Sequence, residues 1–544
     1  MILKENTSRQ KLRGAYYTPL TLAEKIVTYY KGDTSIRTVL EPSCGDGVFF
    51  DALIKQNLIS SFSNLTGIEI VKDETEKLSE KLSCYPNIKI KNADFFDFYK
   101  QNVDEKRYDL ILGNPPYIRY QYLTEAQRAE MSEILTSHEM KSNKLINTWV
   151  AFVVACVHLL SRNGKIAFVI PAEILQVAYA EDLRIFLSHN LSNITLLAFK
   201  DLVFPDIEQE IVALIGEKTS AQKGIRIVEL QNLDDLNIES IRTEEFQPLS
   251  NVHEKWTKYF TSKKETDLIT SVKKDSRFQK LSDCALINVG VTTGNNKYFS
   301  VNEATAKRYD LESISLPLIG RSSHANSVYF EKSDWDENVK NNKAAFLVNF
   351  PDVSFDSYSQ GQKDYIKLGE DTDQNKGYKC SIREKWYRIP SIWVPDAFFL
   401  RRNNLYPKFV LNRCGAISTD TMHRIKFKGG DEPERVILSY YNSISFAFTE
   451  ICGRSYGGGV LEVLPGEVGN IYVPKLDSIP IKKVQTVLKT VDGIVRRYEN
   501  IEKALDIVDS EILVKFLGIE PTLCKQARCI WKKMQKRRLT RSEK

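Results

Sequence analysis

Short apolar runs alternate with amphipathic segments of helical length through the first 220 residues. The apolar runs predict strands at about 38–42, 65–70, 88–92, 108–113, 165–170, 194–199 and 211–216. The segments between them predict helices near 20–31, 47–57, 72–83, 147–161 and 179–190, and the stretch from Asn147 to Leu160 is apolar enough to be a buried helix. Strands that alternate with helices indicate a parallel sheet covered on both faces. We therefore predict an α/β fold with a Rossmann-like, mostly parallel sheet of seven strands.

Beyond about residue 250 this alternation fades, and the sequence becomes rich in turns and aromatic residues. Helical periodicity returns near 481–515 and 520–538. A chain of 544 residues is too long for one compact core. We therefore expect two domains, residues 1–245 with the α/β pattern and residues 250–544 as a mixed α+β domain that ends in helices and a basic tail.

Charge is distributed unevenly between these halves. Residues 1–250 carry 28 Lys and Arg against 34 Asp and Glu, whereas the remaining residues carry 48 against 36. Much of the basic excess lies in residues 525–544, which hold nine basic residues and one acid. A polyanionic partner bound mainly by the second half is consistent with this distribution. A basic tail is also common as a solvated chain end.

Composition excludes several classes of protein. No apolar run is long enough to span a bilayer, and the first residues lack the apolar core of a signal peptide. The nine cysteines are scattered, with no Cys-x-x-Cys and no paired His-Cys spacing. We expect a cytoplasmic protein without membrane attachment and without a structural metal.

The most informative motif is the tetrapeptide from Asn114 to Tyr117, Asn-Pro-Pro-Tyr, which follows the apolar run 108–113. Two prolines fix φ near −65° and remove both amide donors, so carbonyl acceptors lie beside the Asn114 side chain. Tyr117 adds a flat aromatic face. An amino group on a planar ring needs two acceptors and an aromatic surface, and this hook offers both. The alternative is an ordinary strand that ends at Pro-Pro.

A second motif follows the first predicted strand. Residues 41–50 read Glu-Pro-Ser-Cys-Gly-Asp-Gly-Val-Phe-Phe, and glycines in a turn from strand to helix let the backbone approach a ligand. An acid about 20 residues later can bind ribose hydroxyls, and Glu69 has that position. The third glycine of a dinucleotide-binding turn is missing. No Gly-Lys-Ser/Thr follows, which argues against a P-loop nucleotidase.

Asp94 and Phe95 close the third predicted strand. At the carboxyl end of such a strand, an aspartate can accept a hydrogen bond from an adenine amino group while the phenylalanine flanks the ring. The alternative for Asp94 is a helix N-cap or turn residue. Acids and glycines at successive strand ends favour a ligand site at that edge of the sheet.

The set of motifs resembles the gamma-class DNA adenine-N6 methyltransferases of type II restriction-modification systems, of the TaqI type. The resemblance rests on residues 14–19 (Gly-Ala-Tyr-Tyr-Thr-Pro), the loop at 41–50, Glu69, Asp94 and the hook at 114–117, in this order. It covers most of residues 14–217. The family implies a methyltransferase domain followed by a target-recognition domain, which we assign to residues 1–245 and 250–544.

The resemblance implies S-adenosylmethionine as the cofactor. Its predicted binding residues are Thr18, Glu41, Ser43, Gly45, Glu69, Asp94, Phe95 and Pro116. Thr18 would lie by the methionine end, Glu69 would hold the ribose hydroxyls, and Asp94 with Phe95 would hold the adenine. Phe152 matches a family position near the cofactor, or else belongs to the helix core.

The resemblance also implies the chemistry of the hook. The Asn114 side-chain oxygen and the Pro115 carbonyl would accept the two N6 protons of an adenine flipped out of duplex DNA, and Tyr117 would stack on the ring. Phe204, in Val203-Phe204-Pro205, resembles the aromatic that packs on the opposite face of that base. The predicted catalytic residues are therefore Asn114, Pro115, Tyr117 and Phe204.

The predicted partner is double-stranded DNA, bound by a monomer. Candidates for contact with bases or phosphates are Asn295, Asn296 and Lys297 on a glycine-bearing loop, residues 401–404 (Arg-Arg-Asn-Asn), and the glycine-rich residues 453–459. Each of these could equally be a polar surface loop. The methylated base sequence does not follow from the residues alone, because direct readout depends on the placement of side chains.

Three other functions compete with this one. Asn-Pro-Pro-Tyr also serves methyltransferases that act on RNA adenine or on a glutamine amide of a protein, since that amide is likewise a planar nitrogen. A second half of roughly 300 residues favours a duplex over a protein loop. A non-catalytic DNA-binding subunit would not need an intact hook and cofactor loop. We expect no fused nuclease, because only about a dozen residues precede Gly14 and no convincing nuclease motif occurs elsewhere.

Overall fold

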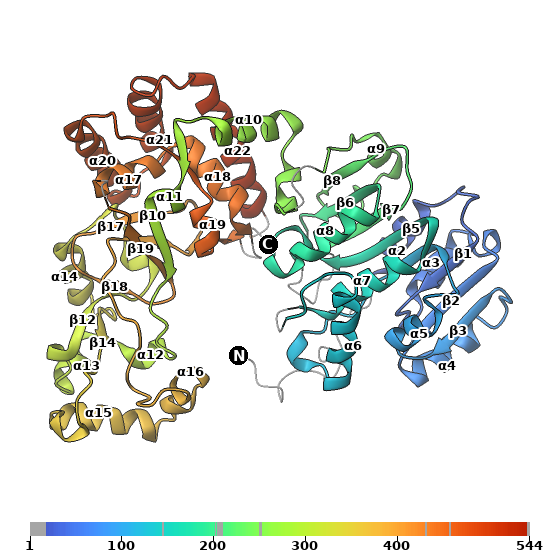
Figure 1. Cartoon of the computed structure of the whole chain (residues 1–544), viewed down its shortest axis with the longest axis horizontal. Coiled ribbons are helices and arrows are strands. Elements are labelled where there is room, and N and C mark those ends of the chain that lie inside the picture. The colour runs from blue at the N-terminus through green and yellow to red at the C-terminus, as the bar shows by residue number, and fades with distance from the viewer. Residues whose placement is uncertain are drawn as a thin grey trace. The chain divides into compact units, whose positions relative to one another are not determined.

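The computed structural model describes residues 18–143, 146–201, 203, 210–249, 253–429, 432–455 and 459–540. The chain divides into two compact units, Met1–Lys263 and Lys264–Lys544 (Figure 1). Each unit is described below by itself. Among the described residues, no helix has both the length and the apolar content needed to cross a membrane.

Unit 1 is built on a mostly parallel sheet of eight strands in the order β3-β2-β1-β4-β5-β7-β6-β8. Its strands are β1 (Thr38–Glu41), β2 (Asn64–Glu69), β3 (Ile88–Asn92), β4 (Tyr108–Gly113), β5 (Leu160–Pro171), β6 (Asn193–Phe199), β7 (Ile211–Glu217) and β8 (Gly224–Leu230). β7 runs antiparallel to both of its neighbours, β5 and β6. The predicted α/β class is confirmed, and seven of the strands lie where the apolar runs place them.

The predicted number of strands was one too low. β8 pairs parallel with β6 along its whole length and forms an edge of the sheet. Its first three residues are buried and its last four are half-buried. An edge strand covered on one side needs no continuous apolar run, so its alternating sequence was weaker than that of the central strands.

Helices of unit 1 are α2 (Leu20–Thr28), α3 (Val48–Lys55), α4 (Lys72–Lys81), α5 (Phe95–Asn102), α6 (Glu125–Thr136), α7 (Thr148–Leu159), α8 (Glu181–Asn190) and α9 (Ile238–Thr243). Every residue of α7 except His158 is buried, which confirms the predicted buried helix. The sequence pattern missed α5 and α6. α6 begins at a capping box in which Thr124 and Gln127 exchange hydrogen bonds. Its apolar and polar residues are poorly separated around the helix, so its sequence pattern did not indicate a helix.

Unit 2 contains two larger sheets and a set of C-terminal helices. The five-stranded sheet has the order β10-β19-β15-β17-β13, and the four-stranded sheet has the order β11-β14-β12-β18. The strands of the first are Ala285–Val289, Met422–Phe427, Ala397–Leu400, Phe409–Asn412 and Tyr329–Phe330; those of the second are Ser300–Val301, Phe346–Val348, Ser315–Ile319 and Ile417–Ser418. The main helices are α10 (Lys263–Lys274), α12 (Asn296–Phe299), α14 (Lys332–Lys340), α15 (Gln360–Asp371), α16 (Tyr378–Ser381), α17 (Pro433–Tyr440), α18 (Ser443–Cys452), α20 (Ile481–Arg496), α21 (Glu502–Val508) and α22 (Pro521–Leu539).

The helix predicted at 481–515 is two helices. α20 ends at Arg496, and Tyr498 takes a left-handed backbone conformation with φ of 54° before α21 begins. A left-handed residue cannot continue a right-handed helix, and no glycine or proline at this position announces the break. Sequence periodicity alone therefore joined the two segments.

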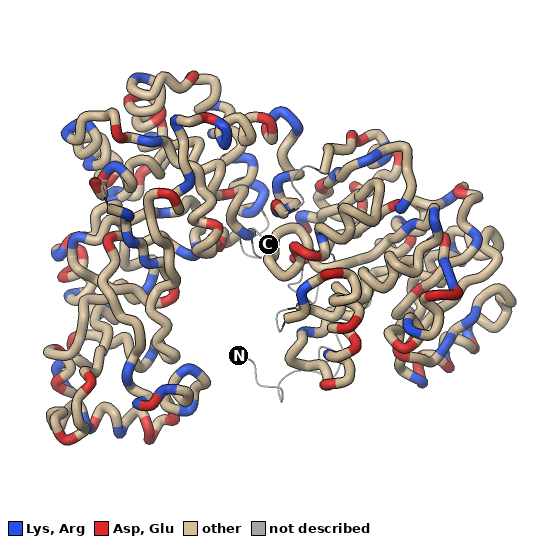
Figure 2. The backbone as a smooth tube through the Cα atoms, viewed as in Figure 1, with Lys and Arg blue, Asp and Glu red and all other residues tan. Residues whose placement is uncertain are grey.

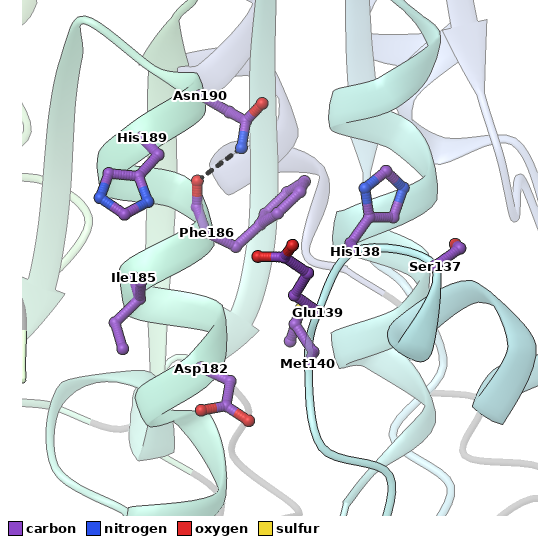
Figure 3. A pocket seen from close by; sticks show the side chains of 9 residues that line it. All are labelled: Ser137, His138, Glu139, Met140, Asp182, Ile185, Phe186, His189 and Asn190. Carbon is purple, nitrogen blue, oxygen red and sulfur yellow. Dashed lines mark hydrogen bonds between the residues drawn. The ribbon is translucent and has the colours of Figure 1, made fainter.

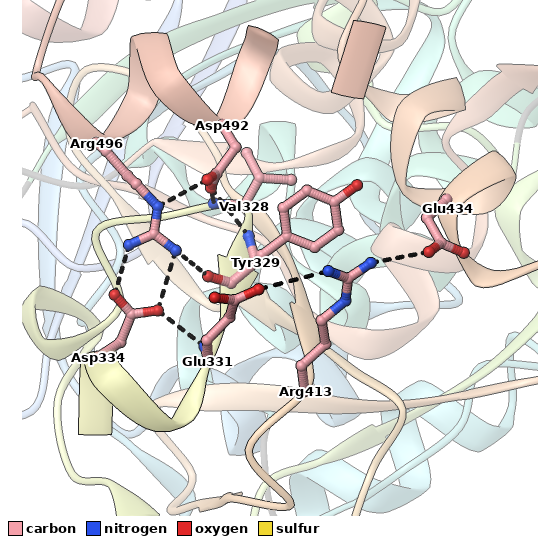
Figure 4. Close-up of polar contacts among 8 residues, drawn as sticks. All are labelled: Val328, Tyr329, Glu331, Asp334, Arg413, Glu434, Asp492 and Arg496. Atoms are coloured by element: carbon pink, nitrogen blue, oxygen red, sulfur yellow. Dashed lines mark hydrogen bonds and ion pairs between the residues drawn. The ribbon is translucent and has the colours of Figure 1, made fainter. Parts of the chain in front are cut away.

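Arg496 ties α20 to the five-stranded sheet (Figure 4). Its guanidinium pairs with Asp334 of α14 and with Asp492 of α20, and it also donates to the carbonyl of Tyr329 in β13. Asp492 in turn accepts hydrogen bonds from the backbone N–H groups of Val328 and Tyr329, at 2.7 and 3.1 Å. One half-buried cation thus holds a helix, a strand and a second helix together.

The basic C-terminal segment is largely engaged within unit 2. Arg538 forms a fully buried pair with Glu450 of α18, 2.9 Å apart. Arg528 pairs with Asp509 at 3.0 Å, and Lys533 pairs with Glu265 at 2.8 Å. These three cations hold α22 against its neighbours. In the described part of the tail, they therefore stabilise the fold of unit 2.

Candidate functional site

The loop between β1 and α3 brings backbone close to a cavity. Gly45 and Gly47 both have positive φ, 51° and 82°. A Cβ on Gly47 would lie 2.3 Å from the Leu78 Cδ1 atom, so both its backbone conformation and its surroundings require glycine. The two glycines therefore let the backbone of the loop approach the cavity at the carboxyl end of β1.

Glu69, the last residue of β2, is held by this loop. Its Oε2 accepts the Gly45 N–H at 2.9 Å, and its Oε1 accepts the Val71 N–H at 2.8 Å. Both carboxylate oxygens are therefore fixed by backbone donors while lone pairs remain for a ligand. The side chain lines the cavity.

Asp94 follows β3 and caps α5. Its Oδ1 accepts the Phe96 N–H at 2.8 Å, so the N-cap alternative is realised. The same residue also lines the cavity, so capping and ligand contact are compatible. Beside it, the Phe95 and Phe152 rings stack with centroids 4.8 Å apart, and Phe96 meets Phe152 at 4.9 Å. Phe152 therefore belongs both to α7 and to the cavity wall.

The hook begins where β4 ends, next to the loop after β1. The Asn114 Nδ2 donates to the Thr18 Oγ at 3.1 Å, and the Ser43 hydroxyl donates to the Asn114 carbonyl at 3.2 Å. Asn114 and Pro116 line the cavity, whereas Pro115 is buried and is not part of its wall. Thr18 thus orients the side-chain amide of Asn114, and Ser43 holds the backbone carbonyl of the same residue.

The far side of the hook is fixed by β5 and α7. The Tyr117 side chain is 8% exposed, and its hydroxyl donates to the Val169 carbonyl at 3.0 Å. The next residue, Ile118, accepts hydrogen bonds from the N–H and the hydroxyl of Thr148. Tyr117 does not line the cavity that Asn114 lines, so the two side chains face different surroundings.

The cavity has a volume of about 740 Å³. All eight residues predicted to bind a cofactor line it: Thr18, Glu41, Ser43, Gly45, Glu69, Asp94, Phe95 and Pro116. The two predicted catalytic residues Pro115 and Tyr117 lie outside its wall, and Phe204 is not among the described residues. A volume of this size suits a ligand as large as a nucleoside derivative.

The polar side of this cavity is acidic. Glu41, Asp46, Glu69, Glu74 and Asp94 line it, and the described residues of its wall include no Lys, Arg or His. Glu41 is 2% exposed, and within the described structure its Oε2 has no hydrogen-bond partner. Burial raises the pKa of Glu41 well above its usual range, and the charges of Asp46 and Glu69 raise it further. A buried acid of this kind is stabilised as a carboxylate only by a donor or a cation that enters the cavity.

Several residues of the cavity wall were not predicted from the sequence. Ile70, directly after Glu69, is 59% exposed in spite of its apolar side chain. Leu123 and Gln127 reach the cavity from the segment that starts α6, and Thr148 reaches it from the start of α7. Ile70 had a local signal, because it follows the ribose-binding position. The others come from segments distant in sequence and carried none.

A second cavity, of about 430 Å³, lies between the end of α6 and α8 (Figure 3). Asp182 accepts the Lys141 N–H there at 2.9 Å. The His138 ring packs edge-on against His158, with centroids 4.9 Å apart, and burial lowers the pKa of both histidines. This cavity has neither a glycine loop nor a hook, and among the described residues no group of His, Cys, Asp and Glu could hold a metal ion.

The candidate DNA-contact residues of unit 2 are mostly engaged in contacts within that unit. Asn295 caps α12 and donates to Gln374, and the Asn296 Nδ2 donates to Asp420 at 3.0 Å. Further along the chain, Arg401 and Arg402 both pair with Glu462, and Arg454 pairs with Glu467. Residues 456–458 lie outside the described residues. Of the predicted loop residues 295–297, Lys297 is the exposed cation.

Comparison with known proteins finds similarity along most of the chain. The model of the Eco57I restriction-modification methylase matches residues 47–204, and the model of the C-terminal domain of the type II methyltransferase M.Eco57I matches residues 253–513. The type II methyltransferase M.AccI of Acinetobacter calcoaceticus is 24% identical over 92% of this chain and 93% of its own length. The chain is therefore similar to type II restriction-modification methyltransferases over most of its length.

Further relatives include restriction-modification enzymes and an RNA methyltransferase. M.HindII of Haemophilus influenzae is 25% identical over 58% of this chain and 60% of its own length. The tRNA1(Val) (adenine(37)-N6)-methyltransferase of Christiangramia forsetii is 26% identical over 32% of this chain and 62% of its own length. The restriction-modification enzyme MmeI, solved in complex with DNA, resembles the fold with a TM-score of 0.57 at 12% identity, over 95% of this chain and 75% of that chain. These similarities support the predicted restriction-modification methyltransferase family.

Proposed function

We propose that this methyltransferase transfers a methyl group from S-adenosylmethionine to N6 of an adenine flipped out of a specific duplex DNA sequence, and so protects that DNA from a cognate restriction endonuclease. The observation that carries the proposal is the junction of the acidic cavity with the Asn114 hook. A cofactor bound in the cavity would lie against Asn114 and Pro116, which line its wall.

The chemistry of the wall fits this cofactor. S-adenosylmethionine carries a sulfonium and an ammonium group, and five carboxylates without a described cation form a field that favours such charges. Glu69 is oriented by two backbone donors to accept from ribose hydroxyls. Phe95, Phe96 and Phe152 offer aromatic surface beside Asp94 for an adenine ring. The same acidic wall would repel the phosphates of a dinucleotide.

Glu41 is the wall residue that a bound ligand would stabilise most. Its Oε2 is buried without a partner among the described residues, and the neighbouring acids make its ionisation costly. An ammonium group, or a donor that it positions, would remove this cost. Thr18 and Ser43 would complete the same end of the site, since each is hydrogen-bonded to Asn114.

The hook would activate the amine. When bound, the cofactor supplies an electrophilic methyl group. The Asn114 side-chain oxygen and the Pro115 carbonyl would accept the two N6 protons, which localises the nitrogen lone pair and points it toward the cavity. Orientation and fixed dipoles then provide most of the rate acceleration. We assign no general base, because the amine proton becomes acidic only as the new bond forms.

Tyr117 would hold the flipped base. Its hydroxyl is occupied by the Val169 carbonyl, so the ring plane is fixed before the base arrives. Stacking on a positioned ring recovers roughly 1–3 kcal/mol of the cost of extruding a base. Phe204, outside the described residues, remains our prediction for the opposite face.

Relatives support the choice of adenine and of DNA. The related tRNA enzyme is named for adenine N6, and MmeI, which resembles the fold, was solved with DNA. The second half of the chain carries 48 basic against 36 acidic residues, which suits a polyanion. Adenine in DNA is a substrate consistent with all of these observations.

The test is a methyl-transfer assay with purified protein and radiolabelled S-adenosylmethionine on three substrates: unmethylated genomic DNA, total RNA and protein extract. We expect label in DNA alone, and sequencing that detects N6-methyladenine should locate it at one sequence motif. Label confined to RNA or protein would overturn the choice of substrate. Label in DNA on cytosine would leave the methyltransferase function intact and overturn the adenine assignment.

A further inference from the structure

The most exposed large apolar side chain of the described structure belongs to α16 of unit 2. Tyr378 is 74% exposed, and Ile382, one helical turn later, is 63% exposed. Residues four apart on a helical turn lie on the same face, so the two side chains form one apolar pair. Most large apolar side chains of this unit are buried, and adjacent exposed apolar side chains are a feature of surfaces that contact a partner.

The pair is presented by a rigid support. Cys380, between Tyr378 and Ile382, is fully buried in a core cluster of unit 2. Trp386 packs against Gly369 of α15 so closely that a Cβ there would lie 2.2 Å from the indole, and its Nε1 donates to Glu370 at 3.1 Å. The buried neighbours of the pair hold α16 against the core, so Tyr378 and Ile382 face solvent in the folded unit.

The loop at residues 292–297 packs against the same segment. Gly294 has φ of 86°, and a Cβ there would lie 3.0 Å from both the Cys380 Sγ and the Lys379 Cβ. Arg383 donates to the Thr292 carbonyl at 3.1 Å, and Asn295 donates to Gln374. Residues 292–297 and 374–383 thus form one surface, which we name the α16 surface.

The α16 surface is basic around its apolar pair. Its two segments contain Lys297, Lys376, Lys379 and Arg383, and the exposed acids Asp373 and Glu384 border the second segment. Figure 2 shows Lys and Arg along the tube at α16. Asp373 pairs with Lys376 at 2.9 Å, but both side chains are more than half exposed, so the pair is weak and phosphate can compete for it. Lys376 and Lys379 lie on either side of Tyr378 in the sequence, so the immediate surroundings of the apolar pair carry cations that suit a polyanion.

We infer that the α16 surface is a DNA-contacting wedge, in which Tyr378 and Ile382 enter a groove of the duplex while Lys297, Lys376 and Lys379 lie on the flanking phosphates. This inference rests on the proposed function and adds the part of unit 2 that contacts the substrate. Apolar side chains that enter a groove contact thymine methyl groups or partly unstack a base step, and both contacts depend on sequence. The pair is then a determinant of specificity, whereas Asn295 and Asn296 support it.

The experiment measures binding of a labelled duplex that contains the methylated sequence found in the assay above. Fluorescence anisotropy over a range of salt concentrations compares wild type, Tyr378→Ala/Ile382→Ala and Lys376→Gln/Lys379→Gln. We expect the apolar variant to bind about 5- to 150-fold more weakly at every salt concentration, because it loses stacking but no charge. We expect the lysine variant to lower the slope of log affinity against log salt by about 1 to 2.

Two controls separate contact from misfolding. Tyr498→Ala removes an aromatic that is 71% exposed on another part of unit 2, so it should bind the duplex as wild type does. The cofactor site lies wholly in unit 1, so each variant should bind S-adenosylmethionine with wild-type affinity in calorimetry. Retained cofactor affinity with an unchanged circular dichroism spectrum identifies a DNA-specific loss.

The outcomes distinguish the inference from the proposed function. Wild-type duplex affinity and methylation by Tyr378→Ala/Ile382→Ala would overturn the inference alone, and the pair would then be a surface for a protein partner. An equal loss in Tyr498→Ala would also overturn it. A wild-type protein that does not methylate DNA would overturn the proposed function and this inference with it.

Discussion

Replacement of Asn114 by alanine is the sharpest test of the hook. The substitution removes the amide that donates to the Thr18 Oγ at 3.1 Å, while the Asn114 carbonyl can keep its hydrogen bond from Ser43 at 3.2 Å. The backbone between two prolines and β4 is held independently by Tyr117 and Ile118. The loop should therefore keep its shape, and the change should be confined to one side chain.

The expected effect on stability is small and the effect on catalysis is large. One partly buried hydrogen bond contributes about 0.5–1.5 kcal/mol to folding. Removal of a positioned hydrogen-bonding group that acts only in the transition state costs about 2.7–4 kcal/mol, or about 10²- to 10³-fold in kcat. Thr18→Val leaves the amide in place but removes its anchor, so we expect a loss of about 2- to 10-fold, the value of one hydrogen bond.

The assay is single-turnover methyl transfer at saturating DNA and S-adenosylmethionine, with cofactor affinity measured separately by calorimetry. Asn87→Ala is a matched control, because Asn87 is an asparagine of the same unit whose Nδ2 donates to the carbonyls of Ile59 and Phe62. It should lower the melting temperature without lowering the rate. If Asn114→Ala transferred methyl groups within about tenfold of the wild-type rate, or if its whole loss came from cofactor affinity, the reasoning would be refuted.

Three further changes test the electrostatics of the fold. Because the pKa of Glu41 is raised in the folded protein, its ionisation costs stability as pH rises above the unfolded value, so Glu41→Gln should raise the melting temperature of the apoprotein at pH 8. The same variant should weaken S-adenosylmethionine binding about 10- to 100-fold in calorimetry, and a lower melting temperature would contradict the account. Burial lowers the pKa values of His138 and His158, so as pH falls these histidines are protonated in the unfolded chain before they are protonated in the folded protein. The free energy of unfolding should therefore decrease as pH drops below about 6.5. His138→Phe should lessen the fall in melting temperature between pH 7 and pH 5. Arg496→Ala breaks the network of Figure 4 and should lower the free energy of unfolding by about 1–3 kcal/mol in chemical denaturation. Arg497→Ala removes an exposed partner of Glu499 and should lower it by under about 1 kcal/mol. Equal losses in the two variants would show that the network does not stabilise the fold.

Local signals account for the parts of the fold that the sequence predicted. Seven strands of unit 1 and the buried helix α7 were visible because apolar residues recur at the spacing of the element, in continuous runs or, in β3, in alternation with lysine. The edge strand β8 and the break at Tyr498 were missed for opposite reasons. β8 carries a weak pattern because one side is covered, and Tyr498 interrupts a pattern that continues without a breaker residue.

The candidate site shows the same division. Every predicted cofactor residue except Thr18 lies at or after the carboxyl end of a strand, and parallel strands bring these ends to one edge, so topology predicted the convergence of these residues. The structure brings all eight to one cavity wall. What sequence could not supply was the contribution of α6 and α7, through Gln127 and Thr148, because those contacts arise from chain segments that enter the site from elsewhere.

The sequence by itself determined the order of the chemical motifs: a glycine loop, an acid after the next strand, and a hook after the fourth. These are properties of short segments, set by backbone preference and residue type. Only the tertiary structure decided which polar side chains are already engaged and which face solvent. It pairs Arg538 with Glu450, uses Asn295 as a cap, and leaves Tyr378 exposed, because hydrogen bonding and burial depend on neighbours that sequence distance does not reveal.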